Sequence, residues 1–388
     1  MKWCHWTLIE LAFLALAVGA GCQRDQQNLP DAAGDVGPVA DAGQTTDTGQ
    51  ATDARQTTDA SEIADAGGVP DSAGGDGDAG LDADVGEPDA EVHYSFAVIA
   101  DPHVDGTPAR REYLGRAVDR LIAERDAWGI ELVFIVGDIA WGGTAELRNL
   151  VDAKEILDRL QDAGMHYVPV LGDNEVQYGD DQEFHEVFSA QYQHLASVLE
   201  GWQQMPTPVD GLYLESFSFE HRGGHFVSPD FISRDTGTEA AELHDFPGGS
   251  WPWFQADIEA AAHGPAKRIN VFTHHGMFQT GFASVDRYLI PAAAMEQIVA
   301  FLCPCRDHVA ASYGGHIHQN WIWEVYCTSG ELIYDVWITD DAHDAVVTPE
   351  QDDERITIRL VEVSETDDGF EYEQHLLVEP TNVETPPR

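Results

Sequence analysis

The sequence predicts an α/β fold in which buried parallel strands alternate with helices. The short apolar runs typical of strands that are buried on both faces are residues 94–100, 130–136 and 167–171. The stretches between them, 113–122 and 145–163, carry apolar residues at the spacing of one helix face. This alternation is characteristic of strand–helix–strand units.

Each predicted strand ends in side chains that can bind a metal. The first ends at Asp101 and His103, the second at Asp138, and the third at Asp173 and Asn174. Two later strands, 268–273 and 308–314, end in imidazoles, namely His274 and His275, then His316 and His318. Because the carboxyl ends of parallel strands form one ligand-binding edge, we expect all of these side chains to meet in one crevice.

The chemistry of these donors predicts a metal site. Any one of them alone is better explained as a turn former or a helix cap. Together they are carboxylate, imidazole and amide groups, which ions of intermediate hardness such as Mn, Fe and Zn accept. Without Asn174 and His275, seven candidate ligands remain, which exceed the needs of one ion and favour two.

Residues 1–22 have the features of an export signal. A lysine at position 2 precedes an apolar run from Leu11 to Val18 that is too short to span a bilayer, and small residues lead to Cys22. The stretch before Cys22 resembles a bacterial lipobox, although Gly19 replaces the usual Leu and Glu10 lies at the edge of the run. We expect lipidation of Cys22 and anchoring to the cell envelope, at the outer membrane or the periplasmic face; plain secretion is the alternative.

Residues 23–92 predict a disordered, acidic tether. They contain no aromatic residue, and an Asp recurs at every sixth position from Asp35 to Asp71. Such a composition cannot bury enough apolar surface to fold. The remaining residues, 93–388, are sufficient for one large domain.

The charge of the chain is strongly acidic, with 20 Lys and Arg against 69 Asp and Glu, a formal net charge of −49. Residues 93–388 hold 17 of these cations and 51 of the anions, a net charge of −34. Such a surface repels polyanions, so we exclude long nucleic acid as a partner. Adaptation to a salty environment explains the charge as well as an acidic binding face does.

Three cysteines in the predicted domain, Cys303, Cys305 and Cys327, allow one disulfide in an oxidising compartment. Cys303 and Cys305 are too close in sequence to pair with each other, so we expect a bond from one of them to Cys327. A soft metal site is the weaker interpretation.

The five strand ends, in order, resemble the signature of the calcineurin-like metallophosphoesterases, the superfamily that includes purple acid phosphatases. The matching motifs are Asp101-Pro102-His103, Gly137-Asp138, Gly172-Asp173-Asn174-Glu175, His274, and Gly315-His316-Ile317-His318. The segments 216–230 and 250–261 resemble the paired strands and the helix of the family's middle section. The resemblance covers residues 94 to 318.

The resemblance implies a four-layer αββα sandwich of two mixed β-sheets and a dinuclear metal site. One ion would be held by Asp101, His103, Asp138 and His318. The other would be held by Asp138, Asp173, His274 and His316, with Asp138 bridging. The implied reaction is hydrolysis of small phosphate esters by a metal-activated hydroxide that attacks in line with the leaving oxygen.

The chain departs from the family at Asp173, where Asn is usual, and at Asn174, where His is usual. A carboxylate can replace an amide on a metal, whereas Asn cannot give up a proton as the family's His does. Asn174 therefore indicates an altered catalytic acid. His275 could supply the proton, although a structural role beside His274 is favoured.

Three alternatives stay open for the function. The scaffold could serve a phosphodiesterase or a nucleotide hydrolase, or the chain could bind metal with little turnover because of Asn174. We expect a monomer. The strands 321–326, 332–338 and 356–363 are expected to complete the second sheet and to carry no chemistry. Burial in the core is favoured for Trp141 over lining the crevice, and structural roles are favoured for His221 and His225.

Overall fold

The computed structural model describes residues 93–141, 146–176, 181–208, 212–235, 240–264, 268–342, 356–366, 369–378 and 382–384. The predicted signal, Cys22 and the predicted tether lie outside this part of the chain. No helix among the described residues is long and apolar enough to cross a membrane.

Two mixed sheets form the centre of the fold. The first has the order β13-β12-β11-β1-β2-β3, and the second has the order β4-β5-β6-β7-β8-β10-β9. The strands of the first sheet are β1 (His93–Ile99), β2 (Ile130–Val136), β3 (His166–Val170), β11 (Thr357–Thr366), β12 (Gly369–Val378) and β13 (Asn382–Glu384). Those of the second are β4 (Glu200–Gln204), β5 (Phe217–His221), β6 (Gly224–Ser228), β7 (Arg268–Phe272), β8 (Val309–Gly314), β9 (Trp321–Tyr326) and β10 (Leu332–Ile338).

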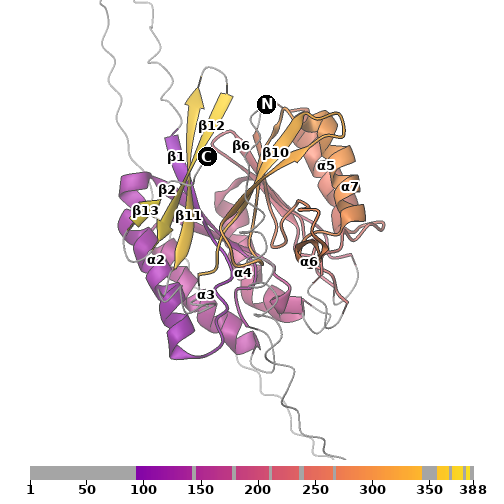
Figure 1. The fold of residues 1–388 in the computed structure, drawn as a ribbon. Helices are drawn as coiled ribbons and strands as arrows, with labels where there is room; N and C mark the ends of the chain where they lie inside the picture. Colours follow the sequence, from indigo (N-terminus) through magenta and orange to yellow (C-terminus); the bar gives the residue numbers. More distant parts are fainter. Residues whose placement is uncertain are drawn as a thin grey trace, which may run out of the picture. The chain divides into compact units, whose positions relative to one another are not determined.

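Helices cover the outer faces of both sheets, which gives four layers (Figure 1). The helices packed on the first sheet are α2 (Pro108–Trp128), α3 (Glu146–Asp162) and α4 (Gln182–Val198). Those on the second are α5 (Ser250–Ala262) and α7 (Ala292–Leu302), and a short helix, α6 (Ala283–Asp286), precedes α7. The expected αββα sandwich is therefore confirmed.

The core between the two sheets is aromatic. Phe96 and Phe134 come from the first sheet, and Phe226, Phe272 and Tyr313 from the second. Phe134 stacks on Phe272 with ring centroids 3.6 Å apart, and Phe96 meets the other four rings edge-on. Burying rings of this size supplies a large share of the apolar area that stabilises a domain.

One expectation about the last strands is wrong. β9 and β10 do complete the second sheet, but β11 belongs to the first, where it pairs antiparallel with β1. Without β11, β1 would be an edge strand whose buried backbone groups had no hydrogen-bond partners on one side. The apolar pattern of β11 predicted a strand correctly but contained no information about its partner.

A buried arginine links the sheets. Arg359 on β11 donates hydrogen bonds to the Ile338 carbonyl at the end of β10 (2.7 Å) and to Gln374 Oε1 on β12 (3.1 Å). Burial lowers its pKa to about 10, which still leaves it charged at neutral pH. These bonds join the first sheet to the second at the carboxyl end of β10.

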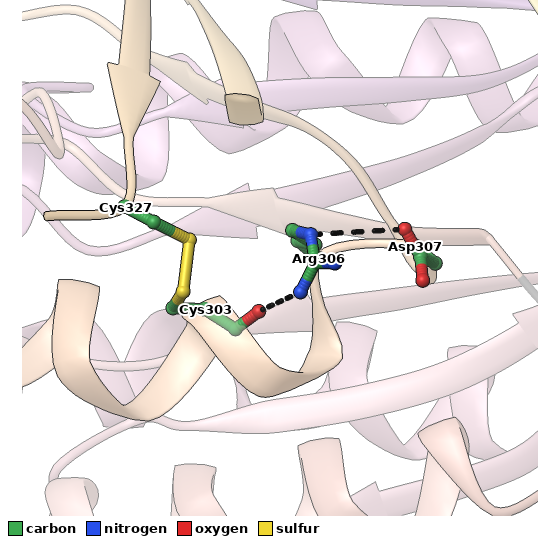
Figure 2. Close-up of a disulfide and its surroundings, with 4 residues drawn as sticks. All are labelled: Cys303, Arg306, Asp307 and Cys327. Carbon is green, nitrogen blue, oxygen red and sulfur yellow. Dashed lines mark hydrogen bonds and ion pairs between the residues drawn. A yellow bond between two sulfur atoms is a disulfide. The ribbon is translucent and has the colours of Figure 1, made fainter. Parts of the chain in front are cut away.

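The predicted disulfide joins Cys303 to Cys327, and Cys305 is a free thiol (Figure 2). Cys303 begins a 3₁₀ turn directly after α7, and Cys327 directly follows β9. Arg306 donates to the Cys303 carbonyl at 3.1 Å, which fixes the turn that carries the bond. The disulfide thus ties the outer helix layer to the edge strand of the second sheet.

Candidate metal centre

The structure brings all seven predicted ligands together at the carboxyl ends of β1, β2, β3, β7 and β8. Their donor atoms form two groups, and within each group the atoms lie within 4.8 Å of one another. The first group is Asp101, His103 and His318, and the second is Asp138, Asp173, His274 and His316. The strand-end argument therefore placed these side chains correctly.

In the first group, the histidines surround a fully buried carboxylate. Asp101 Oδ1 lies 3.9 Å from His103 Nε2 and 3.5 Å from His318 Nε2. The backbone N–H of His316 donates to the other oxygen, Oδ2, at 2.9 Å. Oδ1 and two imidazole nitrogens thus face a common point.

The second group is tighter. His274 Nε2 lies 2.8 Å from Asp173 Oδ1 and 3.2 Å from Asp138 Oδ1, and His316 Nδ1 lies 3.0 Å from the same Asp173 oxygen. His274 donates its other ring nitrogen, Nδ1, to the Val136 carbonyl at 2.9 Å. That bond directs Nε2 toward the carboxylates and fixes the ring.

Asp138 lies between the two groups. Its Oδ2 is 3.0 Å from His103 Nε2 in the first group, and its Oδ1 is 3.2 Å from His274 Nε2 in the second. One carboxylate thus presents one oxygen to each group, which is the arrangement that a bridging ligand requires.

The electrostatics of the site call for a cation. Asp101, Asp138 and Asp173 are all buried, and buried charges are costly unless paired. Burial and the neighbouring Asp173 raise the pKa of Asp138 to about 7. Three carboxylates and four imidazoles, collected in a buried space, form a donor set that suits divalent ions of intermediate hardness.

The backbone around the centre is strained. Five of the seven residues have a left-handed backbone with φ between 45° and 70°: Asp101, His103, Asp138, His316 and His318. This conformation costs a non-glycine residue about 1 kcal/mol or more, and such strain gathers at functional sites. No pattern in the sequence indicated this backbone strain.

Two motif glycines are required by close packing. A Cβ on Gly172 would overlap the Asp138 backbone nitrogen, and a Cβ on Gly315 would overlap the Asp101 carboxylate. The absence of a side chain at each position lets two strand ends approach closely enough for their carboxylates to share the site.

Asn174 contacts the bridging carboxylate. Its Nδ2 donates to Asp138 Oδ2 at 2.7 Å and lies 3.2 Å from His103 Nε2, and its backbone N–H donates to Asp138 Oδ1 at 3.0 Å. Its amide therefore lies within the centre. His275 is also buried, with its ring centroid 4.2 Å from that of His316, and it lines a small cavity with His274 and Ser228.

Glu175 and Asp341 contribute to the site in ways that the sequence reasoning missed. The Glu175 carboxylate accepts backbone N–H bonds from Asp138 (3.0 Å), Ala140 (2.9 Å) and Gly172 (2.8 Å), which joins the loops after β2 and β3. Asp341 Oδ2 lies 3.2 Å from His318 Nδ1. The motif that contains Asn174 could have drawn attention to Glu175, whereas no pattern marked Asp341.

The expected burial of Trp141 is wrong. Its side chain is 41% exposed, and its ring lies edge-on to His103 with centroids 5.0 Å apart. The Arg110 guanidinium lies over the ring, 5.4 Å from its centroid. His221 and His225 belong to neither donor group, and each pairs with a carboxylate, Glu131 and Asp257 respectively, at 2.7 Å.

Two solved phosphatase structures are similar to this chain. No curated protein matches the chain. A dimetal phosphatase from Danio rerio is 16% identical, with a TM-score of 0.47, over 72% of this chain and 98% of its own. A purple acid phosphatase from yellow lupin (Lupinus luteus) seeds is 12% identical, with a TM-score of 0.43, over 74% of this chain and 52% of its own.

The comparison with protein families is decisive, because residues 94–320 match the calcineurin-like phosphoesterases. This segment is more than half of the chain and contains every residue of the two donor groups. The chain therefore belongs to the calcineurin-like phosphoesterase family, whose members are phosphate-ester hydrolases with a dinuclear metal centre.

Proposed function

We propose that this chain is an exported phosphoesterase that hydrolyses small phosphate esters with two bound metal ions. The observation that carries the proposal is the pair of buried donor groups with the Asp138 carboxylate between them. Asp101, His103 and His318 would hold one ion, Asp173, His274 and His316 the other, and Asp138 both. Mn, Fe and Zn all suit these donors.

Two ions bound there would lower the pKa of a water molecule and neutralise the charge that develops on the phosphoryl oxygens. The chain's own residues hold the geometry. Glu175 fixes the loops that carry Asp138 and Gly172, and the Val136 carbonyl orients His274. The Asn174 amide, at the Asp138 carboxylate, can donate a hydrogen bond to a phosphoryl oxygen but cannot protonate the leaving group.

Asn174 also supports a second candidate function, a metal-binding domain with little turnover. All seven ligands are present, which argues against it, since a domain that has lost catalysis has no need for a complete site. A phosphodiesterase or a nucleotide hydrolase would use the same centre, and the acidic surface disfavours long nucleic acid as substrate.

Export and lipid anchoring through Cys22 are part of the proposal and rest on the sequence of residues 1–22. Cell fractionation with labelled fatty acid tests them. Label in the membrane fraction that disappears in Cys22→Ala is expected. Unlabelled protein in the medium would favour plain secretion.

The activity is tested by metal analysis of the purified chain together with a screen of aryl phosphate monoesters and diesters. We expect two ions per chain and hydrolysis of at least one ester class. Asp138→Asn should lower the metal content and abolish hydrolysis while the circular dichroism spectrum is unchanged. Full activity with two ions in that variant would refute the bridging assignment.

A further inference from the structure

We propose that Asp341 is a positioning residue that orients His318 for metal binding in the first group. The inference rests on the proposed function, because it concerns how one of the proposed ligands is held. It adds a residue that lies outside the family match, which ends at residue 320.

Carboxylates lie next to both ring nitrogens of His318. Nε2 is 3.5 Å from Asp101 Oδ1 on the side of the first group, and Nδ1 is 3.2 Å from Asp341 Oδ2 on the other side. A proton on Nδ1 shared with Asp341 leaves the lone pair of Nε2 directed toward Asp101 and His103. An imidazole ligand whose second nitrogen donates to a carboxylate is fixed in tautomer and orientation and is a stronger donor.

Asp341 is itself held firmly. It is the third residue after the end of β10 and pairs with Ala100, the residue before Asp101, in a parallel bridge. Ala342 donates its N–H to the Ala100 carbonyl at 2.8 Å, and the Asp341 N–H is bonded to Asp340 Oδ1 at 3.0 Å. The side chain is 8% exposed. These contacts place the carboxylate beside the strand end that supplies Asp101.

The position of His318 explains why it needs such a partner. Its side chain is 29% exposed, whereas the side chains of His103 and His274 are at most 3% exposed. Packing alone fixes such a partly exposed ring poorly. The Val136 carbonyl orients His274 by the same kind of bond, so the two groups each contain an imidazole held through Nδ1.

The test is competition for Zn²⁺ between the full chain and a chelator, with bound zinc counted per chain. In Asp341→Ala we expect one of the two ions to be lost at a chelator concentration about 10- to 100-fold lower than in the unaltered chain, and the other to be retained. Asp341→Asn keeps an oxygen that can accept the Nδ1–H bond, so it should lose much less. Asp335→Asn is the matched control, because it removes a carboxylate from β10 that faces Glu324 across the strand pair.

A double variant separates positioning from a general structural role. If Asp341 acts through His318, adding Asp341→Ala to His318→Ala should cause no further loss of zinc. Equal weakening of both ions, with a lower melting temperature of the metal-free chain, would overturn the inference and assign Asp341 to strand anchoring. Unchanged zinc affinity in Asp341→Ala would overturn it while leaving the proposed function intact. If the unaltered chain bound no metal at all, the proposed function would fail with it.

Discussion

We expect Asn174 to determine which leaving groups the proposed centre can release. Its Nδ2 lies 2.7 Å from Asp138 Oδ2, where the family's histidine would have a proton to give. Because an amide has no such proton, the leaving oxygen must depart largely unprotonated. We expect good activity on nitrophenyl esters, poor activity on alkyl phosphates, and a steep negative slope of log rate against leaving-group pKa.

Asn174→His should flatten that slope and raise the alkyl-ester rate at least about tenfold, because general acid catalysis contributes 10²- to 10⁴-fold. Asn174→Ala is the control, since it removes the amide without adding an acid and should leave the slope steep. A flat slope in the unaltered chain would show that another group, with His275 the first choice, supplies the proton.

His225, which belongs to neither donor group, makes the free energy of unfolding depend on pH. Burial alone would lower its pKa, but the hydrogen bonds that His225 donates to the carboxylates of Asp257 (2.7 Å) and Glu220 (3.2 Å) raise it to about 9. Because the folded pKa exceeds the unfolded value of about 6.5, this stabilisation is complete below pH 6.5 and is lost as the pH rises through 9.

Asp257→Asn should therefore lower the free energy of unfolding by roughly 2–4 kcal/mol at pH 6, and the difference should shrink by pH 10. Urea unfolding at both pH values measures it. Glu259→Gln, an exposed change on the same helix, should show no such trend. A difference that stayed constant with pH would mean that Asp257 acts through packing rather than through the charge of His225.

At single residues, the sequence could predict only features that depend on neighbouring positions in the chain. The seven proposed ligands were identifiable because each ends a strand, and strand ends are marked by apolar runs that stop. Asp341 follows a strand too, yet its significance depends on a contact with Ala100, which lies 241 positions earlier. Trp141 was assigned to the core because tryptophan is mostly buried, and only the fold shows it beside His103.

At the scale of elements, every strand and helix that was predicted exists, and the pairing of β11 was wrong. Apolar periodicity reports which face of an element is buried, whereas partner choice depends on contacts across the whole chain. For the same reason, the sequence predicted that Cys327 forms the disulfide but not with which of the other two cysteines. Spacing excluded a bond between Cys303 and Cys305 but could not choose which of them lies near Cys327.

The Cys303–Cys327 bond should stabilise the junction of α7 and β9, because it closes a segment with a sequence separation of 24. Cys303→Ser is expected to lower the free energy of unfolding by about 2–4 kcal/mol, mainly by freeing the unfolded chain. Cys305→Ser is the matched control and should have no such effect under oxidising conditions. Equal losses in both variants would indicate that packing of the turn, not the covalent bond, provides the stability.

At the scale of the whole molecule, the acidic charge is the dominant property. Residues 93–388 have a net charge of −34, and like charges on one compact body repel one another. We expect the melting temperature of the metal-free chain to rise between 0.01 and 0.5 M NaCl, since the Debye length falls from about 30 Å to below 8 Å. Thermal unfolding followed by circular dichroism measures it.

The shape of that salt dependence identifies its cause. Screening should produce most of the gain below about 0.2 M and then level off, with KCl giving the same curve as NaCl. A gain that continued linearly to high salt would indicate preferential exclusion of the salt instead. A melting temperature that fell with salt would show that attractive ion pairs outweigh the repulsion.

The bridge between Ala100 and Asp341 has a mechanical consequence. It joins the first sheet to the second at the edge that carries both donor groups, and the Arg359 bond to the Ile338 carbonyl joins them nearby. Motions that separate the two sheets should therefore be smallest at this edge and largest at the opposite edge. The amide hydrogen of Ala342, which is bonded to the Ala100 carbonyl between the two sheets, should exchange with solvent as slowly as those of the central strands.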